Sequence, residues 1–252
     1  MESSIDIREK NGIRQLYFDA SQCLQGAMRI SHPWNLELEY TRAMMASLLM
    51  RDASLFPRSV LLIGLGAASL TKFLYRNCPL AKLTVVEINP GIVEAARKYF
   101  ELPDDPARID IVIGDGAEYM LTTGQQYDLI LVDGFNEHAH PGGLNELRFY
   151  EACRIRLKDQ GLLAVNLIGL CPGVKGGFAY IENAFEHRAV MFPVCKSGNT
   201  IAFATTGEPV NIPHSELKQR ALALRTRTGL DLLHTIAKLE EDEACQFSGL
   251  SF

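Results

Sequence analysis

Five short, continuously apolar runs alternate with helical segments through the middle of the chain. They occupy residues 59–63, 82–87, 108–113, 127–133 and 161–166. A strand that is apolar on both faces has to be covered on both faces, and the helices between such strands supply that cover. The alternation therefore predicts an α/β fold with a doubly wound, mostly parallel, Rossmann-like sheet.

The two ends of the chain follow different patterns. Residues 1–52 predict a short N-terminal segment with a β-strand or hairpin at 14–19 and a helix at 36–51. Residues 53–252 hold the Rossmann-like domain. Near its end, two apolar runs flank the turn-like Lys-Ser-Gly-Asn stretch at 196–199, which is a hairpin signal. We therefore expect the sheet to finish with an antiparallel pair of strands.

Composition and charge exclude several classes of function. The 252 residues carry a formal net charge of -5 without a stripe of Lys and Arg, so we expect no nucleic-acid partner. No apolar run approaches the roughly 18 residues of a membrane span, and residues 1–10 lack the apolar core of a signal peptide. The cysteines are scattered without a CxxC pair, which fits a reducing compartment. We expect a cytoplasmic protein without a membrane partner.

Two glycines and an acid follow the first two strands of the predicted sheet. In a doubly wound sheet the ligand lies outside the carboxyl ends of the strands. Gly64 and Gly66 permit a tight turn there and let a ligand approach the backbone. Glu87, with Ile88 beside it, ends the second strand at a spacing that suits a carboxylate accepting hydrogen bonds from both ribose hydroxyls. A plain turn and a solvated acid are the alternatives.

A second acid, Asp115, follows the third strand and precedes Gly116. Its carboxylate can accept a hydrogen bond from an adenine amino group, and the alternative is an N-cap for a helix over 117–121. Together with the glycines and Glu87, this acid indicates an adenosine-containing cofactor. Ser69 stands where the dinucleotide fingerprint has its third glycine, which disfavours a nicotinamide dinucleotide.

Asp133 ends the fourth strand, where the reacting end of the cofactor should lie. A carboxylate at that point can take a proton from an attacking nucleophile, which is worth about 10²–10⁴-fold in rate. The alternative is a turn acid before Gly134. The following loop contains Glu137, His138 and His140, but no third histidine is nearby, so we expect no metal site.

Residues 58–167 resemble the spermidine synthase (polyamine aminopropyltransferase) family, within the class I methyltransferase-like fold. The resemblance rests on Val-Val-Glu-Ile-Asn-Pro at 85–90, Val-Ile-Gly-Asp-Gly-Ala-Glu-Tyr at 112–119, Tyr-Asp-Leu-Ile-Leu-Val-Asp at 127–133 and Leu-Asn-Glu-Leu-Arg-Phe-Tyr at 144–150. It implies that Glu87 holds the ribose and Asp115 the adenine. It also implies that Asp133 accepts the proton of an attacking amine.

The reaction that this resemblance implies moves an aminopropyl group from decarboxylated S-adenosylmethionine to an amine such as putrescine and leaves methylthioadenosine. Gln25, or alternatively Gln22, matches the family's early glutamine near the cofactor. The N-terminal segment is shorter than the β-domain that, by this resemblance, helps full-length family members to dimerise. The sequence therefore leaves the oligomeric state open, with a homodimer as one possibility.

Three departures from the family pattern concern the amine groups. Ala67 stands where the family's glycine loop carries an aspartate that holds the aminopropyl amine, and Asn136 stands where a second aspartate faces the polyamine. Arg42 stands where the family's Tyr-His-Glu motif, which begins here at Tyr40, has its glutamate. A diamine needs anionic partners to offset its desolvation. We therefore place Tyr40, Asn136 and Glu137 at the substrate, with Glu137 as a replacement carboxylate.

Three functions stay open. The first is an aminopropyltransferase that acts on a small-molecule amine. The second is a methyltransferase that uses intact S-adenosylmethionine and releases S-adenosylhomocysteine, which Ala67 favours and for which Arg42 would face the methionine carboxylate. The third is a non-catalytic nucleoside-binding protein that has kept the cofactor site.

Overall fold

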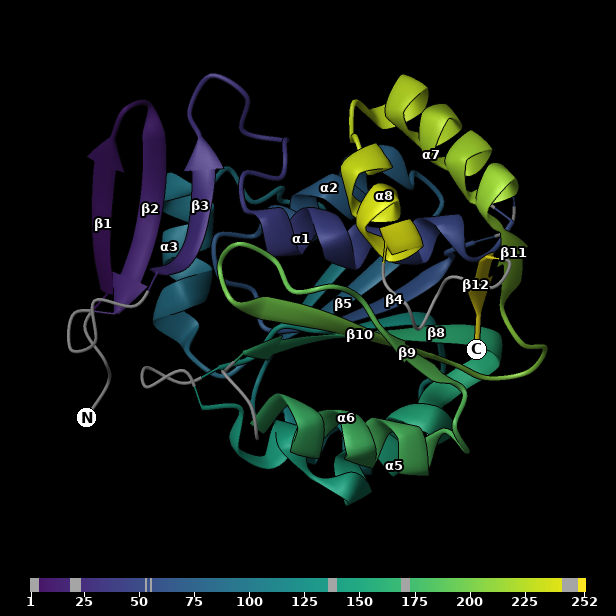
Figure 1. The fold of residues 1–252 in the computed structure, drawn as a ribbon. Helices are drawn as coiled ribbons and strands as arrows, with labels where there is room; N and C mark the ends of the chain where they lie inside the picture. Colours follow the sequence, from purple (N-terminus) through teal and green to yellow (C-terminus); the bar gives the residue numbers. More distant parts are fainter. Residues whose placement is uncertain are drawn as a thin grey trace.

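A seven-stranded sheet runs through the centre of the molecule (Figure 1). The computed structural model describes residues 5–18, 24–52, 54, 56–135, 140–168, 173–241 and 249–252. The strands of the central sheet are β4 (Ser59–Ile63), β5 (Lys82–Glu87), β6 (Ile109–Ile113), β7 (Tyr127–Val132), β8 (Leu157–Ile168), β9 (Ala189–Met191) and β10 (Asn199–Thr205). The five apolar runs of the sequence thus form the strands β4 to β8.

The strands of this sheet lie in the order β6-β5-β4-β7-β8-β10-β9. The neighbouring pairs from β6 to β8 are parallel, whereas β10 is antiparallel to both β8 and β9. The chain therefore winds outward from β4 to β6, returns to β7 and continues outward on the other side. The predicted doubly wound fold with a terminal antiparallel pair is confirmed. Such a sheet opens a crevice where its strand order reverses, here between β4 and β7.

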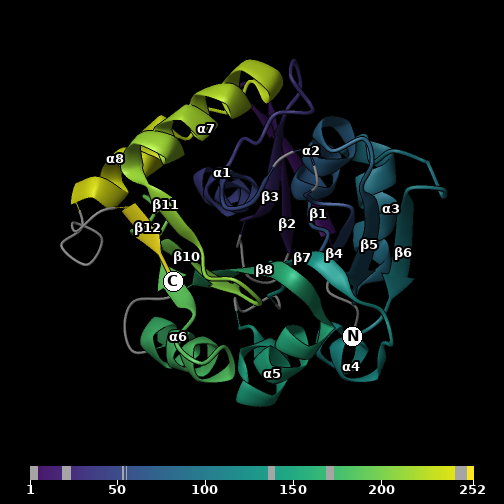
Figure 2. The same cartoon turned by 90° about the vertical axis from the view of Figure 1, so that its right-hand side faces the viewer.

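Helices cover both faces of this sheet (Figure 2). The helices on one face are α4 (Gly116–Thr122), α5 (Leu147–Arg156) and α6 (Gly173–Ala184). The helices on the other face are α1 (Glu39–Met44), α2 (Ser69–Asn77), α3 (Pro90–Tyr99), α7 (His214–Thr228) and α8 (Leu233–Glu241). Alternate residues of β4 show this division. Val60 and Leu62 join the core under the second group, whereas Leu61 and Ile63 join the core under the first.

The helix predicted at 36–51 is shorter in the structure. α1 begins later and passes into a 3-10 helix, η1 (Met45–Leu49). Nη1 of Arg42 donates to the carbonyl oxygens of Leu36 at 2.9 Å and Glu37 at 2.7 Å. This side chain thus satisfies carbonyl groups that lie before the first residue of the helix.

An antiparallel three-stranded sheet precedes the central domain in the chain (Figure 1). Its strands are β1 (Ile5–Lys10), β2 (Ile13–Phe18) and β3 (Leu24–Arg29). Asn11 and Gly12 join the first two strands with φ values of 54° and 72°, as a type I′ hairpin turn requires. The strand or hairpin predicted at 14–19 is confirmed, within the described residues, by β2 and its two partners.

Lys72 of α2 fastens this small sheet to the central domain. Its side chain is 1% exposed, and its Nζ donates to the carbonyl oxygen of Phe100 at 2.6 Å and contacts Sδ of Met28 at 3.0 Å. Burial lowers the pKa of this ammonium group to about 8. Nearby, a Cβ on Gly26 of β3 would lie 2.6 Å from that of Ala67. β3 is thus held tightly against the turn that follows β4.

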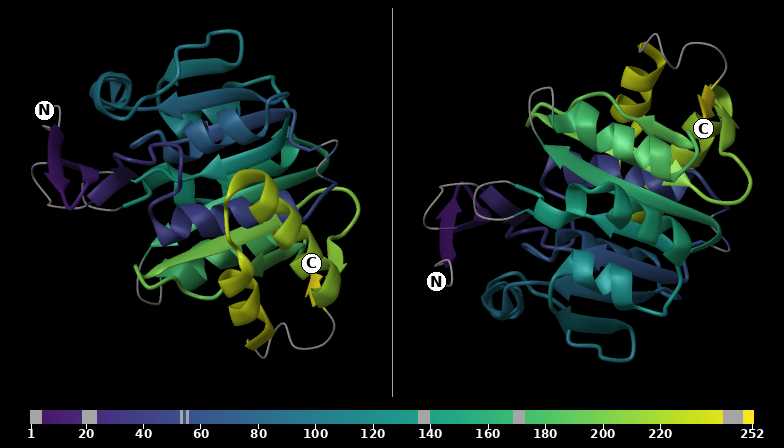
Figure 3. Two further views of the ribbon diagram at one scale, coloured as in Figure 1. Left: turned by 90° about the horizontal axis from the view of Figure 1, so that it is seen from above. Right: turned by 90° about the horizontal axis from the view of Figure 1, so that it is seen from below.

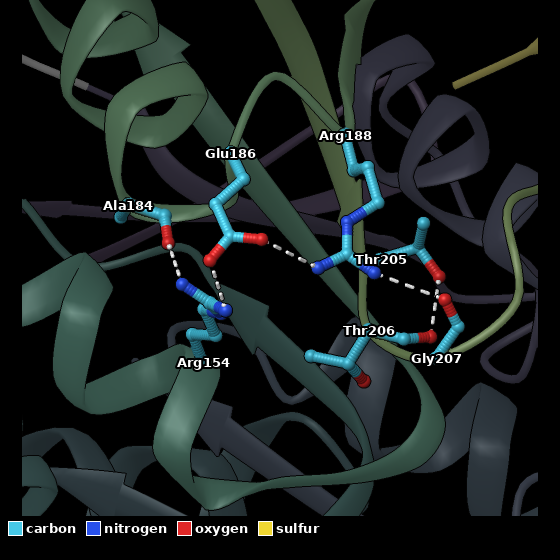
Figure 4. Close-up of polar contacts among 7 residues, drawn as sticks. All are labelled: Arg154, Ala184, Glu186, Arg188, Thr205, Thr206 and Gly207. Carbon is cyan, nitrogen blue, oxygen red and sulfur yellow. Dashed lines mark hydrogen bonds and ion pairs between the residues drawn. The ribbon is translucent and has the colours of Figure 1, made fainter.

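A network of ion pairs secures the end of β10 that lies away from Asn199 (Figure 4). The carboxylate of Glu186 accepts from Arg154 of α5 at 2.5 Å and from Arg188 at 3.2 Å. Arg188 also donates to the carbonyl oxygen of Gly207 at 3.0 Å. These contacts tie α5 and the turn before β9 to the segment after β10, so the antiparallel edge of the sheet is braced at one end.

The C-terminal part of the chain lies on the opposite side of the molecule from the N-terminal sheet (Figure 3). There, β11 (Asn211–Pro213) pairs with β12 (Gly249–Ser251) in a two-stranded antiparallel sheet. In the part of the chain that the structure describes, no helix combines the length and the apolar character needed to cross a membrane.

Candidate active site

A cavity of about 630 Å³ opens at the carboxyl ends of β4, β5, β6 and β7. It is lined by every predicted site residue that the structure describes: Gln25, Tyr40, Gly64, Gly66, Glu87, Ile88, Asp115, Gly116 and Asp133. The predicted substrate residues Asn136 and Glu137 lie outside the described residues. The side chains meet because the turns after four neighbouring strands share one edge of the sheet.

The turn after β4 brings the backbone to this cavity. Gly64 and Gly66 have φ values of 93° and 50°, in the left-handed region that favours glycine. A Cβ on Gly64 would overlap the carbonyl oxygen of Asp133, and a Cβ on Gly66 would lie 2.9 Å from the carbonyl oxygen of Gln25. The two glycines therefore let the turn fit between β3 and the end of β7.

Glu87 holds the turn after β4 to the end of β5. Its Oε2 accepts from the N–H of Leu65 at 2.9 Å, and its Oε1 accepts from the N–H of Asn89 at 2.9 Å. Burial raises the pKa of this carboxyl group, and the backbone N–H donors oppose the rise. The carboxylate lines the cavity at the end of β5, where the predicted ribose site needs an acceptor.

Asp115 is both the N-cap of α4 and part of the cavity wall. Its Oδ1 accepts from the N–H groups of Ala117 at 2.8 Å and Glu118 at 2.9 Å. Both capping bonds go to the same oxygen, so Oδ2 is not used by the cap. The two interpretations of this acid from the sequence are therefore compatible, because one oxygen caps the helix and the other is left for a ligand.

Asp133 accepts a hydrogen bond on each of its carboxylate oxygens. The hydroxyl of Tyr40 in α1 donates to Oδ2 at 3.1 Å, and Nδ2 of Asn166 in β8 donates to Oδ1 at 2.8 Å. Burial raises the pKa of this carboxyl group, and the two donors oppose the rise. Burial and the charge of Asp133 together raise the pKa of the Tyr40 hydroxyl well above its usual value. Tyr40 therefore remains a donor, and the oriented carboxylate is suited to act as a general base.

Three further cavity residues near Asp133 were not predicted from the sequence. Nδ2 of Asn199 donates to Oδ1 of Asn166 at 2.9 Å, and the hydroxyl of Ser197 donates to Oδ1 of Asn199 at 2.6 Å. Asn166 carried one signal, because it is a polar residue near the end of an apolar strand. The position of Asn199 beside it depends on the order of strands in the sheet, which no local pattern reveals.

Glu39 of α1 adds an unpredicted carboxylate to the cavity wall. Its Oε2 accepts from the backbone N–H of Lys196 at 2.9 Å, and its Oε1 lies 3.2 Å from Nζ of Lys238 in α8. Burial raises the pKa of Glu39, but the N–H of Lys196 and the ammonium of Lys238 outweigh that effect and hold the pKa below its usual value. This acid is therefore ionised at neutral pH.

Arg42 does not take the position expected for a methyltransferase. Its guanidinium donates to the carbonyl oxygens of Leu36 and Glu37, and it does not line the cavity. The expectation that it faces a methionine carboxylate is therefore wrong, because the start of α1 uses this side chain for backbone contacts. Ala67 does line the cavity and supplies no charge there.

The described wall of the cavity is acidic. Its carboxylates belong to Glu39, Glu87, Asp115 and Asp133. Since the described lining residues include no Lys or Arg, a positively charged ligand is favoured. The described residues contain no group of three His, Cys, Asp or Glu side chains able to hold a metal ion. His140 lines the cavity, whereas Glu137 and His138 fall outside those residues.

The strand order places this protein in the methyltransferase-like class of α/β folds, with a cavity at the carboxyl ends of its central strands. The family model described as the spermine/spermidine synthase domain matches residues 37–167. A polyamine aminopropyltransferase of Neisseria meningitidis is 34% identical over 239 residues, which are 94% of this chain and 89% of that protein. The chain belongs to the spermine/spermidine synthase family, as the sequence resemblance predicted.

Two solved structures confirm the fold. A spermidine synthase in complex with the transition-state analogue AdoDATO matches with a TM-score of 0.67 and 21% identity, over 94% of this chain and 84% of that one. Human methyltransferase-like protein 13 in complex with SAH matches with a TM-score of 0.68 and 25% identity, over 76% of this chain and 93% of that one. The predicted methyltransferase-like sheet is thus shared with proteins that bind adenosyl ligands.

Proposed function

We propose that this protein is an aminopropyltransferase that moves the aminopropyl group of decarboxylated S-adenosylmethionine to a small-molecule amine and releases methylthioadenosine. The observation that carries the proposal is the position of Asp133, which lies in the same acidic cavity as Glu87 and Asp115 and is held by two hydrogen-bond donors. Family membership supports the same activity, since the matched Neisseria protein is a polyamine aminopropyltransferase.

The adenosyl end of the donor would lie over the turns that follow β4, β5 and β6. Glu87 would accept hydrogen bonds from the ribose hydroxyls, and Oδ2 of Asp115 would accept one from the adenine amino group. Gly64 and Gly66 have no side chains, so the ligand could approach the backbone closely there. The donor supplies a sulfonium that activates the neighbouring carbon, and the acidic wall favours that positive charge.

Asp133 serves as the general base in the proposed reaction. The amine nitrogen forms a bond to the carbon next to the sulfonium, and the carbon–sulfur bond breaks with its electron pair remaining on sulfur. The proton that the amine loses goes to the Asp133 carboxylate. Burial raises the proton affinity of this group, while Tyr40 and Asn166 keep it oriented and oppose its protonation before the reaction.

Glu39 is our candidate partner for a second ammonium group on the acceptor. Its neighbour in the helix, Tyr40, contacts Asp133, so α1 joins the two carboxylates along one wall of the cavity. A diamine has one nitrogen that reacts and one that stays charged, and the charged one needs an anionic partner. Glu39 would supply this anion, since Ala67 supplies no charge at the cavity wall.

The methyltransferase alternative loses its main structural support, because Arg42 does not line the cavity. The non-catalytic alternative does not account for the hydrogen-bonded carboxylate of Asp133. A homodimer, the lack of a nucleic-acid partner and a cytoplasmic location stay predictions.

The test is a comparison of donors and of one variant. We expect the protein to release methylthioadenosine from decarboxylated S-adenosylmethionine in the presence of putrescine, and to bind methylthioadenosine in a calorimetric titration. Asp133→Asn should lose about 10²–10⁴-fold in turnover and keep its affinity for methylthioadenosine. Asp110→Asn, an exposed change in β6, is the matched control and should behave as the wild type. Methyl transfer from intact S-adenosylmethionine, without aminopropyl transfer, would contradict the proposal.

A further inference from the structure

We propose that Asn199, acting through Asn166, is a positioning residue for Asp133, and that this pair of amides keeps the carboxylate aimed and ready to accept a proton. The inference rests on the proposed function of Asp133 as the general base. It concerns residues behind the base whose arrangement depends on the strand order.

The hydrogen bonds form one continuous chain to the base. Ser197 Oγ donates to Asn199 Oδ1 at 2.6 Å, Asn199 Nδ2 donates to Asn166 Oδ1 at 2.9 Å, and Asn166 Nδ2 donates to Asp133 Oδ1 at 2.8 Å. All four residues line the cavity. Every bond therefore points its donor towards the carboxylate.

The direction of this chain follows from chemistry. An ionised carboxylate only accepts hydrogen bonds, so Asn166 must turn its Nδ2 towards Asp133. Its Oδ1 then faces Asn199, which must offer an N–H in return. Without Asn199, Oδ1 of Asn166 would lose its donor, and the carboxylate alone would hold the amide in this orientation. Asn199 thus reinforces the orientation in which Nδ2 of Asn166 faces the base.

The sheet places the two asparagines side by side. Asn199 pairs with Ile168 across the antiparallel β8–β10 ladder, and Asn166 lies two residues before Ile168 on the same face. Val165 of β8 pairs with Val132 of β7. The next residues along these parallel strands are Asn166 and Asp133, which therefore lie beside each other. Three adjacent strands thus carry the amides and the base to one edge.

Burial makes the mutual pairing of the two amides important. Asn166 is only 3% exposed and Asn199 only 6%. Buried amides cost free energy unless each polar atom is paired, and apolar residues at two such positions in a sheet would avoid that cost. The geometry points to the retention of this pair for its effect on Asp133.

Several titratable groups share the cavity with Asp133 and act on it together with the amides. They are Glu39 and Tyr40 on α1, Glu87 at the end of β5, Asp115 after β6 and His140 before the 3-10 helix η2 (Gly142–Asn145). Of these, Tyr40 is bonded to Asp133 directly. A substitution at position 199 alters none of these side chains, so the leucine variant tests the amide chain.

The experiment compares Asn199→Leu and Asn199→Asp with the wild type. The leucine removes the donor to Oδ1 of Asn166, whereas the aspartate replaces that donor with an acceptor that competes with Asp133 for Nδ2 of Asn166. We expect the acidic limb of the pH–rate profile, measured with decarboxylated S-adenosylmethionine and putrescine, to move to higher pH by about half to one unit for leucine. The shift should be larger for aspartate, because its negative charge also disfavours ionisation of Asp133, so the leucine variant carries the test. On that limb the rate falls about threefold to tenfold at fixed pH.

Two controls separate positioning from folding. Thr200→Val changes the next buried residue of β10, which does not line the cavity, and should leave the profile unchanged. Ser197→Ala removes an exposed hydroxyl at the outer end of the chain and should give a smaller shift in the same direction, even if the changes at Asn199 prevent folding. Affinity for methylthioadenosine should be unchanged in every folded variant.

A carboxyl-carbon NMR titration of Asp133 reads the same effect without turnover. A wild-type protein that transfers no aminopropyl group would overturn the proposed function, while the titration would still test the effect of Asn199. If the wild type is active and Asp133 titrates at the same pH in the Asn199 and Ser197 variants as in the wild type, this inference is overturned and the proposed function stands.

Discussion

A methyl group on Gly64 would overlap the carbonyl oxygen of Asp133. The turn proposed to approach the adenosyl ligand and the residue proposed as the base are therefore in direct backbone contact. The N–H of Asp133 also donates to the carbonyl oxygen of Ile63, one residue before the turn, at 2.9 Å. A change in one part of the site is thus transmitted to the other.

Gly64→Ala should damage both binding and turnover. Alanine is strained at a φ of 93°, and its Cβ would displace the backbone at Asp133. We expect a loss of at least about 2 kcal/mol in the free energy of unfolding, measured by denaturant titration. The affinity for methylthioadenosine should fall as well. Gly124→Ala, where a Cβ meets no atom within 4 Å, is the control and should have little effect on either quantity.

Tyr40→Phe should move the acidic limb of the pH–rate profile upward. The base accepts a proton only when it is ionised, and burial already raises the pKa of Asp133 above its ordinary value. Removal of the donated hydroxyl at 3.1 Å raises that pKa further, by up to about one unit. Activity should then be lost at a higher pH as the solution is acidified. Tyr75→Phe, which removes a similar bond to Asp105 away from the cavity, should leave the profile in place.

Glu39→Gln should weaken binding of a diamine acceptor while leaving the adenosyl site intact. The carboxylate is partly exposed and already paired with Lys238, so we expect the KM for putrescine to rise only about threefold to fivefold. The KM for the donor should stay constant. Glu37→Gln, two residues away and outside the cavity lining, is the matched control. Equal KM values for putrescine in Glu39→Gln and in the control would show that Glu39 does not bind the acceptor.

Lys72→Met should change how stability depends on pH. The folded-state pKa of Lys72 is about 8, against a usual 10.5, because burial disfavours its charge. Between these values the unfolded chain binds more protons, so the free energy of unfolding of the wild type rises with pH. We expect this rise to exceed that of the variant by about 3 kcal/mol between pH 8 and 10.5. Denaturant titrations at several pH values measure it.

The control for Lys72→Met is Lys82→Met, an exposed change in β5 that should keep the wild-type dependence on pH. Parallel stability curves for Lys72→Met and the wild type would show that the buried ammonium has an ordinary pKa in the folded protein.

Local patterns in the sequence determined the architecture and brought the glycine turn and the acids of the cavity together. Continuous apolar runs predict strands covered on both faces, and the glycine turn and the acids after successive strands meet because a parallel sheet gathers its carboxyl ends at one edge. Asp115 shows the same locality, since its capping bonds reach only two and three residues ahead. Signals of this kind involve near neighbours in the chain, so they are readable before folding.

Only the tertiary structure decided what surrounds the base. The bond from Asn199 to Asn166 spans 33 residues and exists because β10 pairs antiparallel with β8 instead of extending the parallel order. Glu39 lines the cavity and Arg42 does not. The start of α1 at Glu39 and the orientation of this helix over the sheet decide which of its side chains reach the cavity. Contacts between residues far apart in the chain depend on strand order and helix orientation. The packing of the whole core decides the strand order and the helix orientation, and no local sequence pattern encodes either.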